Sequence, residues 1–209
     1  MPRKARTHFA ILGLLCWKPM SGYDIKKMVE VGLSFFWSES YGQIFPTLNR
    51  LVEEGLATKK VDPDSGGRRR QVYTVTKAGR RSFKTWLHQP TESPRLRDEL
   101  KLKFFLTARS DTSEGVRLLD EYREQQLEHL AMLKESEVIL AAALKGAGMH
   151  PELMELQKTL GWDDSKMSHD QSHELLVFYL TLRSGILMAE SRVAWVEEVR
   201  PVLLAGCLK

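Results

Sequence analysis

Residues 38–87 constrain the fold of this chain most, because helical and strand patterns follow one another there in a fixed order. Apolar residues first recur at intervals of four and three, as on one face of a helix: Ile44, Leu48 and Leu51. Short runs with β-branched residues follow at 59–62 and 71–76, and a helical pattern closes the segment near residue 87. This order predicts a helix, a β-hairpin and a second helix.

The helix that carries the apolar stripe has a start signal. Ser40 and Gln43 have the spacing of a capping box, in which each side chain bonds the backbone amide of the other residue. Pro46 removes a backbone donor soon after that cap, so we expect a kink or a later helical start. Thr47 and Arg50 are expected on the polar face, opposite the stripe.

The connection between the two strand runs is dense in turn formers, since residues 63–67 read PDSGG. Three arginines follow it directly: Arg68, Arg69 and Arg70. We therefore expect a hairpin with an arginine-rich tip. Thr76 is expected to cap the next helix, and residues 89–94 have the composition of a linker. The predicted domains are residues 1–88 and 89–209.

Charge is distributed unevenly over these domains. Residues 1–87 contain 16 lysines and arginines against 7 aspartates and glutamates, whereas residues 88–209 contain 15 against 20. The net charges are therefore +9 and −5, within a net charge of +4 for the whole chain. A basic part joined to an acidic part indicates a module that binds a polyanion, fused to one that does not. Duplex DNA is the polyanion that a polar-faced helix and a basic hairpin fit.

The N-terminal domain is predicted to be a winged helix-turn-helix, because two apolar helical patterns precede the polar-faced helix and the hairpin forms the wing. The side chains expected to read DNA from that helix are Tyr41, Gln43, Thr47 and Arg50, with Asn49 less certain. Backbone amides near Ser40 are expected at a phosphate. The hairpin arginines Arg68, Arg69 and Arg70 suit phosphates or an adjacent minor groove, and Arg3, Lys4 and Arg6 suit a flexible arm.

Two long amphipathic segments dominate the C-terminal domain. Apolar residues recur three and four apart between residues 116 and 144, and again between residues 175 and 203. Both segments exceed the average globular helix of roughly 11–12 residues, and stripes of this length need a partner, either each other or another subunit. The expected fold class is therefore mainly α, with a winged helix-turn-helix domain followed by a coiled-coil-like dimerisation domain of long helices.

An acidic and histidine-containing cluster lies just before the second long segment, and it offers a metal site as an alternative: Asp163, Asp164, His169, Asp170 and His173. A cap for the last helix is the preferred interpretation, because no cysteine joins the cluster. The chain has no phosphate-binding glycine loop, GxSxG or HExxH motif, so neither an enzyme nor a cofactor is expected.

The cellular context follows from two negative observations. Cys16 and Cys207 lie far apart in the sequence and are interpreted as reduced thiols. The apolar run near the N-terminus is about half the ~20 residues that a membrane span requires, and no small-residue cleavage site follows it. We therefore expect a cytoplasmic protein that does not enter a membrane.

These residues resemble the PadR family of bacterial transcriptional regulators, and within it the branch of the AphA-type virulence activators. The resemblance rests on SGYDIKK at 21–27, FWSESYGQIFPTLNRLVEEGLATKK at 36–60 and GRRRQVYTVTKAGRRSFKTWL at 67–87, with a weaker echo in PRLRDELKLKFFL at 94–106. It covers essentially the whole N-terminal domain. Family members usually carry tyrosine where this chain has Phe45, so any contact of that hydroxyl is absent here.

The resemblance implies a homodimer that binds a near-palindromic operator in double-stranded DNA and regulates transcription, with repression expected. The C-terminal helices would form the dimer interface. Regulators of this type often respond to small planar molecules, and Trp195 is the candidate contact for such an aromatic effector. The alternative is a ligand-sensing or protein-interaction module whose winged helix docks protein rather than DNA.

Overall fold

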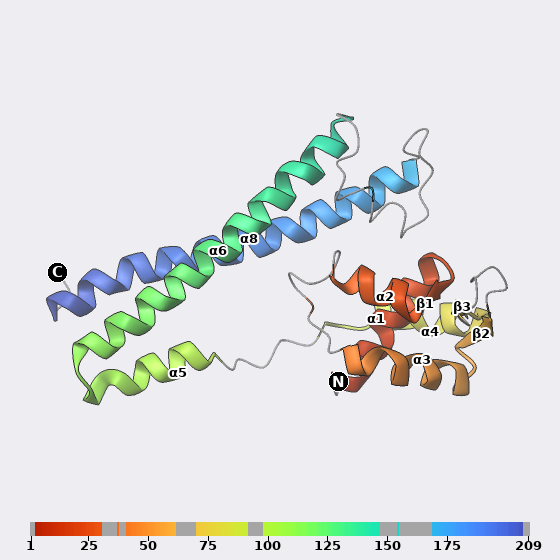
Figure 1. Ribbon diagram of the computed structural model, residues 1–209, viewed down its shortest axis with the longest axis horizontal. Coiled ribbons are helices and arrows are strands. Elements are labelled where there is room, and N and C mark those ends of the chain that lie inside the picture. The colour runs from red at the N-terminus through yellow and green to blue at the C-terminus, as the bar shows by residue number, and fades with distance from the viewer. Residues whose placement is uncertain are drawn as a thin grey trace. The chain divides into compact units, whose positions relative to one another are not determined.

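The computed structural model describes residues 3–30, 37, 41–61, 70–91, 98–146, 154 and 169–206. They form two compact units (Figure 1). The first consists mainly of the described residues up to 91, and the second consists of residues 98–146 and 169–206. The change of unit falls a few residues beyond residue 88, where the sequence places the end of the N-terminal domain. The exact bounds 1–88 and 89–209 stay predictions.

The first unit has the predicted order of helices and hairpin, with one strand added. Its elements are α1 (Arg3–Trp17), β1 (Met20–Ser21), α2 (Gly22–Met28), a 3-10 turn (Tyr41–Gln43), α3 (Ile44–Glu53), β2 (Ala57–Val61), β3 (Gln71–Val75) and α4 (Lys77–Leu87). Because α1 already begins at Arg3, the expectation that Arg3, Lys4 and Arg6 form a flexible arm is wrong; their backbone is helical.

The three strands form one antiparallel sheet in the order β1-β3-β2. The predicted hairpin is confirmed, because β2 and β3 pair over their whole length. Sequence patterns do not reveal β1, since a strand of two residues is too short to show alternation. It pairs with β3, and Ser21 lies opposite Val72. β3 is therefore the central strand, and β2 is left at the edge of the sheet.

An apolar core joins the three N-terminal helices. Each contributes side chains that are almost fully buried: Ile11, Leu12, Leu14 and Leu15 from α1, Ile25 and Met28 from α2, and Ile44, Leu48 and Leu51 from α3. The predicted stripe on α3 is thus confirmed. Burial of each such side chain stabilises the unit by about 1.5–3 kcal/mol relative to exposure, so α3 is held firmly along one face and leaves the other available.

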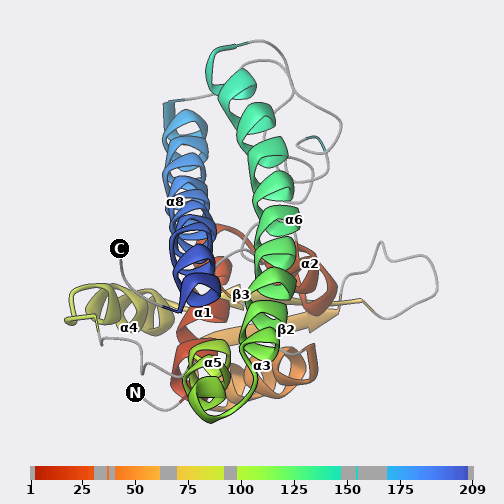
Figure 2. The ribbon, with the colours of Figure 1, turned by 90° about the vertical axis from the view of Figure 1, so that its left-hand side faces the viewer.

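The second unit is built on two long helices, α6 (Thr112–Leu144) and α8 (His169–Ala205), which lie side by side (Figures 1 and 2). The predicted stripes are confirmed, since the residues that are buried between the helices include Leu119, Leu130, Leu133, Leu140, Leu175, Leu182, Ile186 and Val196. Ion pairs fix an antiparallel register: Arg200 with Asp120, Arg123 with Glu197, and Arg183 with Glu137. A shorter helix, α5 (Glu99–Leu106), precedes α6.

Candidate nucleic-acid interface

The face of α3 that is turned away from the core carries a row of exposed side chains. Pro46, Asn49, Arg50 and Glu53 follow the spacing of one helix face, and all four are exposed. Gln43 is also exposed, at the junction between the 3-10 turn and α3. The row mixes amide, guanidinium and carboxylate groups, which are hydrogen-bonding groups able to distinguish base edges.

Thr47 does not belong to this row. It is only 9% exposed, and it shares the buried side of α3 with Ile44, Leu48 and Leu51. The expectation that Thr47 lies on the polar face is therefore wrong. The reason is geometric, because a residue three positions after Ile44 and four before Leu51 falls on the same helix face as both.

The start of α3 agrees with one of the two expectations for Pro46. A 3-10 turn occupies Tyr41–Gln43, and the α-helix begins only at Ile44, so the helical start is late. Gln43 is the N-cap and makes no side-chain capping bond. Ser40 and the side chain of Tyr41 lie outside the described residues, so their predicted roles stay predictions.

Arg50 is held by a carboxylate of its own helix. Its Nε donates a hydrogen bond of 2.7 Å to Oε1 of Glu54, and the other carboxylate oxygen of Glu54 lies 3.6 Å from Nε2 of His8 on α1. Burial lowers the pKa of His8, the charge of Glu54 raises it, and the charge of Arg50 lowers it, with a net lowering. Arg50 is exposed, so it is available to a ligand once Glu54 releases it or turns with it.

Phe45 is the exposed aromatic of α3, and sequence reasoning did not assign it a role. The residue is 57% exposed, yet one edge of its ring packs over Gly22 at the start of α2. A Cβ atom on Gly22 would lie 2.5 Å from Cε1 of Phe45, so an alanine there would force the exposed ring to move. An exposed ring at this point offers an apolar contact of the kind that thymine methyl groups make. Its signal in the sequence is an aromatic residue one position after the start of the buried stripe.

The edge strand β2 adds positive charge beside the central strand. Thr58, Lys59 and Lys60 are all exposed, and among the described residues the two lysines have no carboxylate partner. Gln71 and Thr74 on β3 are exposed as well. The strand pattern at 59–62 does not by itself identify these lysines as functional, although a lysine pair on an edge strand is a signal for a charged surface.

Of the three arginines predicted at the hairpin tip, Arg70 is the one whose position the structure describes. It does not lie at the tip. It directly precedes β3, and its Nη2 donates hydrogen bonds to both carboxylate oxygens of Asp24, at 2.8 Å and 2.7 Å. Arg68 and Arg69 lie outside the described residues, so their predicted phosphate contacts stay predictions. The partner of Arg70 is in the first turn of α2 and was not predicted.

Trp195, the predicted effector contact, lies on α8 in the second unit. Its ring packs edge-to-face against Phe104 of α5, with 6.0 Å between centroids, and Nζ of Lys101 lies 5.9 Å from the ring centroid. These contacts explain why Trp195 is partly buried. A role in ligand binding stays a prediction.

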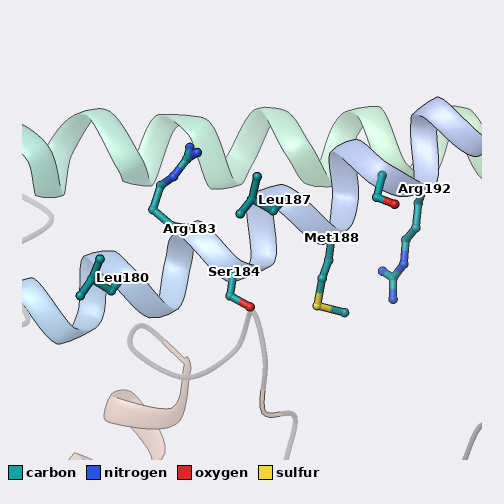
Figure 3. Close-up of a pocket in the computed structure, with 7 residues that line it drawn as sticks. Leu180, Arg183, Ser184, Leu187, Met188 and Arg192 are labelled. Atoms are coloured by element: carbon teal, nitrogen blue, oxygen red, sulfur yellow. The ribbon is translucent and has the colours of Figure 1, made fainter.

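An open groove of about 580 Å³ lies on the outer side of α8, which is the side opposite the residues buried against α6. Its lining residues lie on successive turns of the helix, as Figure 3 shows for those it labels. They are Leu180, Arg183, Ser184, Leu187, Met188, Ser191 and Arg192. Arg183 donates a hydrogen bond to Glu137 and Arg192 donates one to Gln126, both on α6. The arginines are therefore fixed at the flanks, and the apolar side chains Leu180, Leu187 and Met188 remain more than half exposed between them.

The alternative metal cluster lies mostly outside the described residues, since of its side chains only that of His173 is described. Within the parts of the chain that the structure covers, no group of three histidine, cysteine, aspartate or glutamate residues could hold a metal ion. In those same parts no helix is long and apolar enough to cross a membrane.

Two family profiles match this chain. Residues 11–85 match the transcriptional regulator PadR-like family, and residues 96–203 match the virulence activator alpha C-terminal domain. The first match spans most of the winged helix, from α1 to α4, and the second spans α5 to α8.

Known relatives align over nearly the whole chain. The negative transcriptional regulator PadR of Bacillus subtilis is 26% identical over 193 residues, which are 91% of this chain and 93% of that protein. Its crystal structure with operator DNA covers 94% of this chain and 98% of its own, with 26% identity and a TM-score of 0.73. Its structure with p-coumaric acid, also at 26% identity, covers 97% and 98%, with a TM-score of 0.69.

A second similar structure is that of the virulence activator AphA of Vibrio cholerae, which is 26% identical and covers 96% of this chain and 99% of its own, with a TM-score of 0.71. The two profiles together account for both units, and the second alone spans more than half of the chain. The chain therefore belongs to the PadR-like family of transcriptional regulators, in the branch that carries the virulence-activator C-terminal domain.

Proposed function

We propose that this protein is a homodimeric, sequence-specific DNA-binding regulator of transcription. The observation that carries the proposal is the exposed row on α3, which lies in the same unit as an edge strand with two lysines that have no carboxylate partner among the described residues. A rigid helix with exposed amide and guanidinium groups supplies base contacts, and the lysines of the hairpin supply phosphate contacts. The family match and the relative solved with operator DNA support the same conclusion.

In this proposal Gln43, Asn49 and Arg50 read bases in the major groove. Amide side chains pair with adenine and guanidinium groups pair with guanine, each through two hydrogen bonds. Phe45 supplies an apolar contact at the same helix start. Lys59 and Lys60 contact phosphates, which fixes the register of the protein on the duplex without specifying sequence.

A second copy of the chain is the proposed occupant of the outer side of α8. Leu180 and, two turns further on, the adjacent pair Leu187 and Met188 are exposed there (Figure 3), which is unusual for a helix that faces only water. A homodimer carries two α3 helices, the number needed for two half-sites about 34 Å apart on the duplex. Linking two weak half-site contacts raises affinity through effective concentration.

The sign of regulation and the effector are proposed from the relatives. The Bacillus subtilis relative is named a negative regulator and has been solved with p-coumaric acid. For this chain we propose repression, released by a small aromatic compound that binds the helical unit. Trp195 is the residue proposed to contact that compound.

The proposal is tested by selecting bound sites from a random duplex pool with the full-length protein. We expect an inverted repeat to be recovered. Replacing Arg50 by alanine should then cost about 1–3 kcal/mol at the base pair it reads and relax the preference there. Arg117→Ala is the matched control, because Arg117 is also an exposed arginine with a glutamate four residues on, Glu121, but lies on α6.

Two results would contradict the proposal. One is a pool without any enriched sequence, together with an affinity for duplex DNA that does not fall as salt concentration rises. The other is an equal loss in Arg50→Ala and Arg117→Ala, since that loss would not come from the α3 surface.

A further inference from the structure

Asp24 stands at the meeting point of α2, β1 and β3. Its carboxylate oxygen Oδ2 accepts a 2.8 Å hydrogen bond from the backbone amide of Ser21 and a 2.7 Å bond from the Ser21 hydroxyl. The same hydroxyl accepts a 3.2 Å bond from the amide of Asp24. The two residues thus form a complete capping box, and the carboxylate cannot move without disturbing the start of α2.

Arg70 binds this fixed carboxylate from the other side. Its Nη2 donates to both oxygens of Asp24, although 46 residues separate the two in sequence. Two residues further along, Val72 on β3 pairs with Ser21 on β1. The N-terminal end of β3 is therefore held in two ways, by strand pairing with β1 and by the ion pair with Asp24 on α2. The ion pair is partly sheltered, since the Asp24 side chain is 23% exposed and that of Arg70 is 50% exposed.

The charged surroundings favour an ionised Asp24. Burial opposes ionisation of the carboxyl, but the hydrogen bonds from Ser21 and Arg70, and the charge of Arg70, outweigh it and keep the pKa of Asp24 below its ordinary value. Lys18 belongs to the same neighbourhood. Burial lowers the pKa of Lys18, the negative charge of Asp24 raises it, and the positive charge of Arg70 lowers it, with a net lowering. Arg70 therefore already has a dedicated counter-ion.

We propose that Asp24 is a positioning residue for the hairpin. Arg70 holds the N-terminal end of β3 to α2 and does not contact DNA phosphates. The inference rests on the proposed DNA-binding function, because it states how the hairpin is held for that function. It separates Arg70 from the other arginines of the predicted tip. To turn Nη2 toward a phosphate, Arg70 would have to give up two short charge-assisted bonds to Asp24.

The salt dependence of DNA binding distinguishes a positioning residue from a phosphate contact. Each phosphate contact contributes about −0.9 to the slope of log K against log salt concentration. Arg70→Gln should therefore weaken operator binding while it leaves the slope within about 0.3 of wild type. Asp24→Asn should release Arg70 toward phosphates in both copies of the dimer, so the slope should steepen by about 1.8 and the preference for operator over random duplex should fall. Lys60→Gln, on the neighbouring strand β2, is the matched loss of an exposed charge; because a homodimer loses one phosphate contact in each copy, the slope should flatten by about 1.8.

A second measurement on the free protein needs no DNA. Hydrogen exchange of the β3 amides at Val72 and Tyr73 should be roughly two- to fivefold faster in Asp24→Asn and in Arg70→Gln, which corresponds to the loss of one partly exposed ion pair. The double variant should exchange no faster than the faster single variant, because both changes remove the same interaction. The Thr58 amide on β2, away from the pair, serves as the internal reference.

These readouts keep the two proposals apart. If the wild-type protein binds no duplex, the proposed function fails. Hydrogen exchange then still tests whether the Asp24–Arg70 ion pair holds β3. If Arg70→Gln flattens the slope by about 1.8, Arg70 is a phosphate contact in each copy, and the inference is overturned while DNA binding stands. Unchanged exchange at Val72 and Tyr73 in both single variants would overturn it as well.

Discussion

Gly79 lies in the first turn of α4, at the closest approach between that helix and the connection that follows α3. A Cβ atom at this position would lie 2.2 Å from the carbonyl oxygen of Leu56 and 2.8 Å from Cγ2 of Val75. The first distance is more than 1 Å inside the 3.4 Å at which ordinary contact begins, and the obstacle is backbone, which cannot rotate away. Gly79 does not have a positive φ, so space and not backbone conformation requires glycine.

Replacing Gly79 by alanine should therefore push α4 away from Leu56 and weaken the bonds that hold it there. The amide of Thr76 donates to the Leu56 carbonyl at 2.9 Å, and the Thr76 hydroxyl lies 2.8 Å from the carbonyl oxygen of Gly55. Overpacking costs about 1–3 kcal/mol, and each weakened hydrogen bond adds up to about 1 kcal/mol. The better helix propensity of alanine returns about 1 kcal/mol. With about 2 kcal/mol for overpacking, about 1–2 kcal/mol for the two weakened hydrogen bonds and about 1 kcal/mol returned, we expect a net loss of about 2–3 kcal/mol in the free energy of unfolding of the first unit.

Calorimetric unfolding measures this loss, with hydrogen exchange at the amides of α4 assigning the transition to the first unit. A loss of about 2–3 kcal/mol corresponds to a fall of roughly 10–20 °C in Tm for a unit of this size. Gly13→Ala is the matched control on α1. A Cβ there would meet Cε2 of Phe83 at 2.8 Å, but that atom belongs to a partly exposed ring that can turn. We expect this variant to stay within about 1 kcal/mol of wild type; equal losses in the two variants would contradict the explanation.

Two further predictions concern pH and assembly. Because burial depresses the pKa of His8 in the folded protein, the unfolded chain binds more protons, and the free energy of unfolding should fall as pH drops from about 6.5 through the folded pKa. Urea unfolding of His8→Gln should show a smaller pH dependence over this range. The same pH dependence in His8→Gln and wild type would contradict the prediction. Leu187→Glu places a charge in the α8 groove, so sedimentation should show a dimer dissociation constant at least about tenfold higher. Monomer stability should change little, because Leu187 is 56% exposed. An unaltered dissociation constant would exclude this surface as the dimer interface.

The parts of the fold that the sequence predicts are those with long or local patterns. The stripe of Ile44, Leu48 and Leu51 is visible because three apolar residues keep helical spacing, and the hairpin is visible because turn formers separate two β-branched runs. The long helices α6 and α8 repeat their apolar spacing many times, which makes them the most secure part of the prediction.

The parts that the sequence does not predict depend on distant partners or on weak local signals. Thr47 was misplaced because its polar side chain outweighed its position between Ile44 and Leu51. β1 has only two residues, and it exists because β3 supplies a partner for it. The link between Asp24 and Arg70 spans 46 residues, and nothing in the local sequence of either residue identifies the other.

Acidic residues of the first unit decide which of its cations remain available. That part of the chain carries a large excess of lysine and arginine, yet Glu54 binds Arg50 and Asp24 binds Arg70. Lys59 and Lys60, by contrast, have no carboxylate partner among the described residues. A count of basic residues therefore overstates the number of phosphate contacts. If Arg70 holds β3 and Arg50 reads a base, the salt dependence of DNA binding should follow Lys59 and Lys60, which have no carboxylate partner among the described residues, more closely than the total positive charge.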